Sequence, residues 1–337
     1  MQLQENISLQ PYNTFGIDVT AEYFLQLTDK NLIPGIAADN LLPEEKHIIG
    51  GGSNILLTQD VEGLTIHNCL KGIEQIKEDD AHVWLQVASG EVWHELVMYA
   101  ISHNLAGIEN LALIPGTVGA APMQNIGAYG VEVKEVIDSV TAWHWNEQEY
   151  TTYNNQQCRF GYRDSIFKHE LKNKVFITEV VFRLNKQPKL NTSYGAIGQE
   201  LEKMGVTNPT IKNIADAVIA IRSSKLPDPK KIGNAGSFFK NPTIGKEQFE
   251  KLQKDYPELP SYPVDSNTVK VPAGWLIEQC GLKGHKAGNT GVHEKQALVI
   301  VNFGGATGEE IWELSEDVLQ AVYDKFGITL EREVQVW

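Results

Sequence analysis

Two glycine-rich segments without a charged side chain lie in the first 130 residues of this 337-residue chain. The first is Gly50-Gly51-Gly52-Ser53-Asn54, flanked by Ile48-Ile49 and Ile55-Leu56-Leu57, and the second runs from residue 114 to residue 130. Glycines reach backbone conformations closed to other residues and let an anion approach bare amide groups. Two such loops favour a dinucleotide that is held mainly by main-chain amides.

Each loop taken alone has a plainer explanation. A Rossmann fingerprint would need a glycine where Ile55 stands, and no Walker A motif exists because Gly245-Lys246 is followed by Glu247. The first loop by itself is therefore typical of a hairpin turn between two strands. The second could be a buried loop with small residues at a crowded helix contact.

Composition excludes several classes of protein. The hydrophobic fraction of 42% and the charged fraction of 21% are ordinary, which argues against a largely disordered chain. A net charge of −14 argues against sequence-independent nucleic-acid binding. No apolar run is long enough for a membrane helix, and no secretory signal begins the chain. We therefore expect a cytoplasmic protein of two or three domains that binds neither nucleic acid nor membrane.

Cysteine and histidine patterns also agree with a cytoplasmic protein and give no metal-binding motif. The three cysteines, at positions 69, 158 and 280, are odd in number and far apart, which suits a reducing compartment. None of the nine histidines lies in an H-E-x-x-H motif, so we predict no metal site.

Apolar spacing predicts three helices, and β-branched runs predict strands between them. The helices are expected in 92–104, in 211–222, and after a capping box at Thr307–Glu310, with Gly327 ending the last one. The expected strands are 47–49, 55–57, 83–87, 136–143, 175–183 and 297–303. This irregular order favours α+β domains, with a candidate boundary at the two prolines of 225–231.

Two further segments carry charge that chemistry could use. Residues 222–240 hold five basic side chains against one acidic one, which is typical of a solvated face or of a site for a phosphate-bearing ligand. Arg163 beside Asp164 is either a surface turn pair or a planar guanidinium fork for a carboxylate.

Taken in order, these segments resemble one family, the UDP-N-acetylenolpyruvoylglucosamine reductases, flavoenzymes that make UDP-N-acetylmuramate for peptidoglycan. The matching stretches span the chain: 13–16, 50–54, 114–130, 161–165, 225–229, 233–242, 292–298 and 330–334. Asn191-Thr192-Ser193-Tyr194-Gly195 resembles the substrate-covering tyrosine loop of the longer type of this family. Gly288-Asn289-Thr290-Gly291 departs from the family's usual small apolar residues.

The resemblance implies an α+β fold: a two-part FAD-binding module of the vanillyl-alcohol-oxidase (PCMH) type and a C-terminal α+β substrate-binding domain. We expect the first FAD subdomain in 1–70, the second in 71–222 and the substrate domain in 223–327. The tail 328–337 would return to the first subdomain or to the active site. The family's cofactors are FAD and NADPH, its substrate is UDP-N-acetylglucosamine-enolpyruvate, and we expect a cytoplasmic monomer.

The resemblance also implies roles for single residues. Arg163 and Glu333 would stabilise the substrate carboxylate, and Ser237 would protonate C2, with Lys225 or Lys240 near the resulting alkoxide. Substrate contacts would come from Tyr194, Lys225, Asn241 and Gln296. FAD contacts would come from Asn13, Thr14, Gly50, Gly51, Gly52, Ser53, Asn54, Ile114, Pro115, Gly116, Thr117, Gly119, Ala120, Gln124, Asn125, Gly127, Ala128, Tyr129, Gly130 and Tyr162.

Two other functions compete with this interpretation. One is an FAD-dependent oxidase or dehydrogenase of a small sugar or alcohol on the same fold, which would not need the basic stretch or the tyrosine loop. The other is a catalytically silent binder of flavin or sugar nucleotide, which we would expect to lack one of Arg163, Ser237 and Glu333. All three residues are present.

Overall fold

A computed structural model describes residues 2–337, and these residues form two compact units. Unit 1 takes the chain up to Ile7, then Ala21–Gly51 and Glu62–Ser224. Unit 2 takes Ser8–Thr20, Gly52–Val61 and Lys225–Trp337. The chain thus crosses between the units inside the first glycine-rich segment, and the expected three-domain division stays a prediction.

The first sheet of unit 1 has the strand order β1-β2-β5-β3. Its strands are Gln4–Ser8, Thr20–Leu27, Val61–Asn68 and Lys46–Ile49, and β3 runs parallel to β5. The short helices η2 (Lys30–Leu32) and α1 (Ile33–Ala38) follow β2. Leu25, Ile36 and Ile66 are buried in one apolar cluster with Trp143 and Phe176 of the second sheet. This shared core joins the two sheets.

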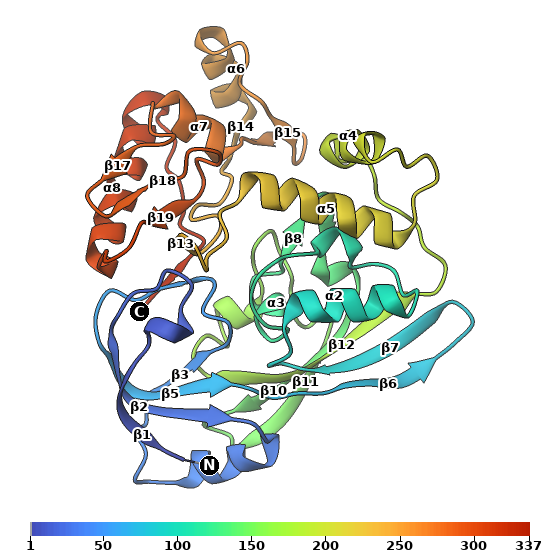
Figure 1. The fold of residues 1–337 in the computed structure, drawn as a ribbon, viewed down its shortest axis with the longest axis vertical. Helices are drawn as coiled ribbons and strands as arrows, with labels where there is room; N and C mark the ends of the chain where they lie inside the picture. Colours follow the sequence, from blue (N-terminus) through green and yellow to red (C-terminus); the bar gives the residue numbers. More distant parts are fainter. Residues whose placement is uncertain (1) are drawn as a thin grey trace. The chain divides into compact units, whose positions relative to one another are not determined.

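The second sheet of unit 1 has the order β11-β10-β12-β7-β6 and is antiparallel. Its strands are Glu149–Asn154, Ile137–His144, Val175–Asn185, His82–Ala88 and Ile73–Glu78. Two helices, α2 (Trp93–Ser102) and α5 (Ile211–Lys225), cover one face of it (Figure 1). Trp93 meets Phe182 edge to face, with ring centroids 5.9 Å apart, and anchors α2 on β12.

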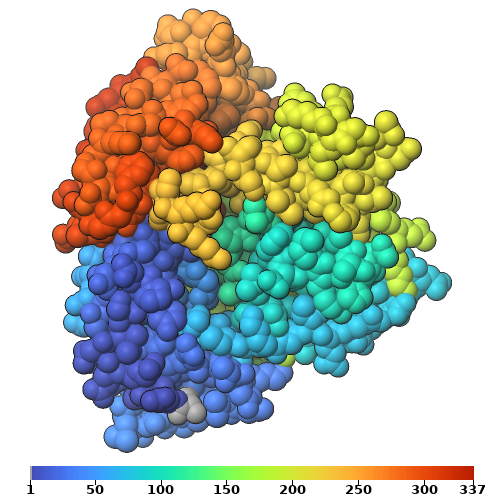
Figure 2. Space-filling model, in the orientation of Figure 1, coloured from blue at the N-terminus to red at the C-terminus, as the bar shows by residue number. Residues whose placement is uncertain are grey.

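Short elements complete unit 1. They are η3 (Glu109–Leu111), α3 (Ala120–Met123), β8 (Gly127–Ala128), β9 (Val131–Glu132), η4 (Val133–Glu135), η5 (Ile166–Lys168) and α4 (Gly195–Lys203). The α4 segment lies at the surface of unit 1, yellow-green in Figure 2.

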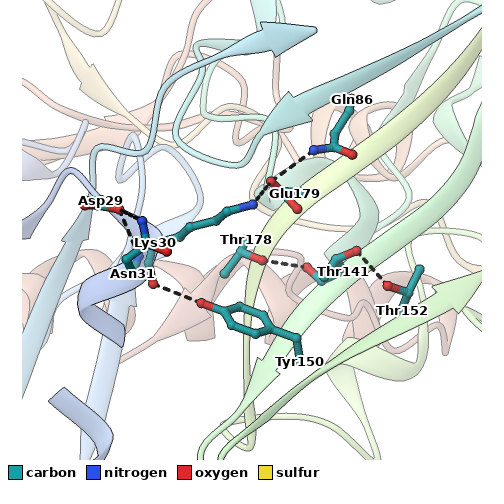
Figure 3. A network of polar contacts seen from close by, with 9 residues as sticks. All are labelled: Asp29, Lys30, Asn31, Gln86, Thr141, Tyr150, Thr152, Thr178 and Glu179. Carbon is teal, nitrogen blue, oxygen red and sulfur yellow. Dashed lines mark hydrogen bonds and ion pairs between the residues drawn. The ribbon is translucent and has the colours of Figure 1, made fainter. Parts of the chain in front are cut away.

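Polar contacts also connect η2, the short helix after β2, to the second sheet (Figure 3). Lys30 of η2 forms an ion pair with Glu179 of β12, and Gln86 of β7 donates to the same carboxylate at 3.2 Å. The Tyr150 hydroxyl donates to the Lys30 carbonyl at 2.9 Å. These contacts fix η2 over the face of the second sheet that the long helices leave uncovered.

Unit 2 contains a four-stranded antiparallel sheet, β13-β19-β18-β17. These strands are Gly233–Asn234, Ile300–Asn302, Thr290–Val292 and Lys286–Ala287. A smaller sheet joins β14 (Thr243–Gly245), β16 (Thr268–Lys270) and β15 (Tyr262–Pro263), and β4 (Ile55–Leu56) runs parallel to β20 (Gln335–Val336). The helices are η1 (Gln10–Tyr12), α6 (Lys246–Asp255), α7 (Ala273–Gln279) and α8 (Gly308–Phe326).

The expected α+β class and the three expected helices are confirmed as α2, α5 and α8. Thr307 and Glu310 form the expected capping box, and Gly327 ends α8 with a φ of 61°. Several expected boundaries were wrong by one or more residues, most of all those of α5 and β19. The helix α5 continues to Lys225, and the last strand is only Ile300–Asn302, since Val299 donates to the Gln296 carbonyl in a turn.

The interpretation of Gly50–Asn54 as a hairpin turn is also wrong. The flanking strands do not pair with each other: β3 is parallel to β5, and β4 is parallel to β20. Parallel neighbours come from distant parts of the chain, so this loop connects two different sheets. Among residues 2–337, no helix combines the length and the apolar character needed to cross a membrane.

The Thr307 hydroxyl caps α8 by accepting a hydrogen bond from Glu310 N at 3.2 Å, and replacing Thr307 by Ala removes this cap. We expect the free energy of unfolding to fall by about 1 kcal/mol. Chemical denaturation measures it, with Thr207→Ala as the control because Thr207 is exposed in a loop. An equal, small effect of both substitutions would contradict the capping account.

Candidate functional site

The two glycine-rich segments touch through their backbones within unit 1. A Cβ atom on Gly51 would lie 3.0 Å from the Cα atom of Gly116, and one on Gly50 would lie 2.4 Å from Oγ1 of Thr117. Gly116 has a φ of 104°, and its carbonyl accepts from Trp93 N at the start of α2. A side chain at position 50 or 51 would force the neighbouring segment to shift, so the glycines of this pattern reflect a packing constraint.

The second segment is fixed internally by a buried asparagine. The Asn125 amide donates to the Gly161 carbonyl at 2.7 Å and to the Glu132 carboxylate at 2.9 Å. Its carbonyl accepts from Lys134 N at 3.1 Å. The side chain of Asn125 therefore shapes the loop and ties it to the turn that carries Tyr162 and Arg163.

Arg163 lies against the same segment. Its Nη2 donates to the Gly127 carbonyl at 2.6 Å, and its guanidinium lies 5.7 Å from the ring centroid of Tyr162. A Cβ atom on Gly127 would come within 3.1 Å of Nη1, so glycine leaves room for the guanidinium. Asp164, its neighbour in sequence, hydrogen-bonds His169 at 2.7 Å.

A second arginine near this point was not singled out from the sequence. The Nε atom of Arg222, on α5, is buried and has no hydrogen-bond partner among the described residues. Burial lowers the pKa of Arg222, and the nearby Arg163 cation lowers that pKa further, whereas Tyr129 raises it. A buried donor of this kind is costly unless a ligand satisfies it.

The sequence did hold a signal for Arg222. It follows Val218 by four positions and Ala215 by seven, so it continues the buried stripe of α5. From the sequence, Arg222 is predicted only as one member of the basic run 222–240, whether that run is a solvated face or a site for a phosphate-bearing ligand. A cation placed at an apolar helical position is the pattern that identifies such a residue.

The tyrosine loop is tied to the second glycine-rich segment within unit 1. The Asn191 amide donates to the Gly130 carbonyl at 3.1 Å, and Asn110 donates to both Tyr129 and Asn191 carbonyls. The exposed ring of Tyr194 meets Tyr129 edge to face at 5.3 Å. Burial raises the pKa of Tyr129, so this hydroxyl stays protonated and can donate.

In unit 2, Thr14 joins the first glycine-rich segment to the Asn234 strand. Its N–H donates to the Gly52 carbonyl at 3.0 Å, and its hydroxyl donates to the Asn234 carbonyl at 2.6 Å. A Cβ atom on Gly52 would lie 1.9 Å from the Tyr12 carbonyl oxygen. Asn13 is buried and bonds Leu9 and Ile17 of its own loop, so its side chain shapes that loop.

In unit 2, backbone pairing holds Glu333 against the residue that follows Ser237. Glu333 N donates to the carbonyl of Phe238, the residue after Ser237, at 2.8 Å. The Asn54 amide donates to the Glu333 carbonyl at 3.2 Å. Phe238 is fully buried and contacts Phe15 edge to face at 6.2 Å. Three residues that lie far apart in sequence, Asn54, Ser237 and Glu333, thus occupy one neighbourhood.

The predicted substrate contacts divide between the units. Tyr194 belongs to unit 1, whereas Lys225, Asn241 and Gln296 belong to unit 2. Asn241 Oδ1 accepts from Ala273 N at 2.9 Å at the start of α7, which leaves its amide nitrogen as a donor. Gln296 Oε1 accepts from Leu298 N at 3.5 Å, and Lys225 is exposed at the end of α5.

Comparison with known proteins finds one family along the whole chain. A family model described as the C-terminal domain of UDP-N-acetylenolpyruvoylglucosamine reductase matches residues 228–337, and one described as an FAD binding domain matches residues 43–151. The reductase of Flavobacterium johnsoniae is 51% identical and that of Chromobacterium violaceum 49%, with at least 98% of each chain covered. A crystal structure of the Thermus caldophilus reductase has the same fold, with a TM-score of 0.69, 23% identity, and coverage of 100% of this chain and 99% of that one.

Replacing Gly51 by Ala should push the two glycine-rich segments apart, because its Cβ would press on the Gly116 backbone. We expect FAD to bind at least about tenfold more weakly, measured as flavin retained and by titration of apoprotein. Gly198→Ala is the control, since a Cβ there meets nothing within 4 Å. Equal flavin affinity of both variants would show that the Gly51–Gly116 contact does not shape the site.

Proposed function

Since this chain belongs to the UDP-N-acetylenolpyruvoylglucosamine reductase family, we propose that it reduces the enolpyruvyl ether of UDP-N-acetylglucosamine-enolpyruvate to UDP-N-acetylmuramate with NADPH and FAD. It would serve peptidoglycan precursor synthesis as a cytoplasmic monomer. The observation that most supports this proposal is the full-length match to a reductase at 51% identity, together with the presence of Arg163, Ser237 and Glu333.

The residues present fit an FAD molecule. Gly50 and Gly51 let the first glycine-rich segment lie directly against Gly116 and Thr117, which brings the backbone amides of both segments together for a flat or anionic ligand. The Nε atom of Arg222 is a buried donor with no hydrogen-bond partner within residues 2–337. We propose that these groups, with Thr14, Ser53, Asn54 and Tyr162, hold the cofactor.

Bound FAD would accept hydride from NADPH and supply it to the substrate's double bond. The protein's task is to orient that bond and to stabilise the negative charge that develops on C2 and the carboxylate. Arg163 suits the carboxylate because its fork is already fixed by the Gly127 carbonyl. Glu333, if protonated, would donate a hydrogen bond to the same carboxylate.

Ser237 would supply the proton at C2. A hydroxyl is a weak acid, but the carbanion it meets is a strong base, so its placement matters more than its acidity. Its backbone is held by Phe238, which donates to the Leu298 carbonyl at 2.7 Å and accepts from Glu333. Tyr194, Lys225, Asn241 and Gln296 would contact the sugar nucleotide, the first two at its diphosphate.

The oxidase alternative gains no support from the comparisons. The relatives reported above carry the reductase name over the full length of the chain. A silent binder is also disfavoured, because no member of the proposed catalytic set is missing.

Replacing Ser237 by Ala should leave FAD binding and flavin reduction by NADPH intact but slow flavin reoxidation by the enolpyruvyl substrate by about 100-fold or more. Anaerobic stopped-flow absorbance of the flavin follows each half-reaction separately. Wild-type protein that is not reoxidised by this substrate would refute the proposed function. An equal rate of reoxidation in variant and wild type would instead remove only Ser237 from the mechanism.

Replacing Arg163 by Lys should also slow reoxidation, because a point charge cannot keep both the Gly127 contact and a planar contact with a carboxylate. We expect at least about a tenfold loss in the same stopped-flow assay. Arg159→Lys is the matched control, since Arg159 pairs with Glu170 at the surface. A near-wild-type rate for Arg163→Lys would contradict the assigned role.

A further inference from the structure

Arg332, the residue before Glu333, is held by three groups on one face of α8. Its Nε donates to the Ser315 hydroxyl at 2.8 Å, and its Nη2 forms an ion pair with Glu316 at 2.6 Å. Its guanidinium also lies 3.8 Å from the ring centroid of Trp312. Positions 312, 315 and 316 are three and four residues apart, so a helix presents them together.

This clamp is better protected than a surface ion pair. The Ser315 side chain is fully buried and donates to the Trp312 carbonyl at 2.6 Å, which orients its oxygen toward Arg332. Only 16% of the Arg332 side chain is exposed, compared with 53% of the Glu316 side chain. Partial burial, a stacked aromatic ring and two hydrogen bonds restrict the guanidinium to one position.

The backbone around Arg332 is extended and paired. Arg332 bridges Phe239, and the flanking bonds run from Lys240 N to the Glu331 carbonyl and from Glu333 N to the Phe238 carbonyl, both at 2.8 Å. Consecutive side chains of an extended segment leave it on opposite sides. With Arg332 directed to α8, the Glu333 side chain must leave the segment on the other side.

We infer that Arg332 is a positioning residue for the reaction. Its contacts with Trp312, Ser315 and Glu316 of α8 fix the register of the tail and the side from which the Glu333 carboxyl leaves it. This inference rests on the proposed function, because it assumes that Glu333 contacts the substrate.

The test compares Arg332→Met with wild type in the two anaerobic half-reactions. Methionine keeps an unbranched apolar stem but removes the charge and the donors. We expect FAD content and flavin reduction by NADPH to stay within about twofold of wild type. Reoxidation by the enolpyruvyl substrate should slow by about tenfold or more, because small displacements of a catalytic group are costly.

A double variant separates positioning from general stability. In a Glu333→Gln background, Arg332→Met should slow reoxidation no further, since the group that it positions is already altered. Arg332→Lys should recover part of the rate, and Arg159→Met, which removes a surface pair with Glu170, should have no effect. If Arg332→Met loses flavin, Ser315→Ala takes its place, because it removes only the Nε acceptor and the bond to Trp312.

Three results would overturn the inference. The Arg332 variants could be reoxidised at the wild-type rate, or they could lose equally in both half-reactions. The double variant could also be slowed by the product of the two single-variant factors, which would mean that the two residues act independently. Wild-type protein that the substrate does not reoxidise would instead refute the proposed function itself.

Discussion

The hydrogen bond from Glu333 N to the Phe238 carbonyl holds the chain's last segment against the loop that contains Ser237. On its other side the same tail bonds Asn54, through Gln335 N at 3.0 Å, and continues as β20 beside β4. One short strand therefore brings three distant parts of the chain together in unit 2. The proposed proton donor and the proposed carboxyl partner of the substrate both depend on this pairing.

A different constraint organises unit 1. The close contact of Gly51 with Gly116 requires that no side chain lies between the two backbones. The buried Asn125, in the second segment, then connects that segment to the turn with Arg163 through its hydrogen bond to the Gly161 carbonyl. The Nε atom of Arg222, close to the same arginine, adds a buried donor that no residue described in the structure satisfies. Burying a donor without a hydrogen-bond partner destabilises a folded protein, and a ligand that accepts the hydrogen bond offsets this cost. The unit thus carries features of a ligand site in its backbone as well as in its side chains.

Local patterns in the sequence predicted α2, α5 and α8, because the signal for each of these helices is contained in one segment. The capping box of Thr307 and the stripe of α8 are examples. The first glycine-rich loop shows the opposite case. Its strand flanks suggested a hairpin, but their true partners, β5 and β20, are set by topology that no short window contains. The resemblance of the ordered motifs to one family supplied what local patterns could not, and the full-length relatives confirm that family.

The residue types of the site could be predicted from the sequence, but the contacts that hold those residues in place could not. The family resemblance alone marked Ser237 and Glu333. Nothing in the sequence indicated that Arg332, the residue before Glu333, contacts α8, since those contacts depend on the fold. A crystal structure with FAD and the enolpyruvyl substrate tests the central claim most directly. We predict the Ser237 hydroxyl about 3 Å from C2, with Arg163 and Glu333 on the substrate carboxylate. A complex in which these three side chains contact separate parts of the ligand, or none of it, would contradict the account.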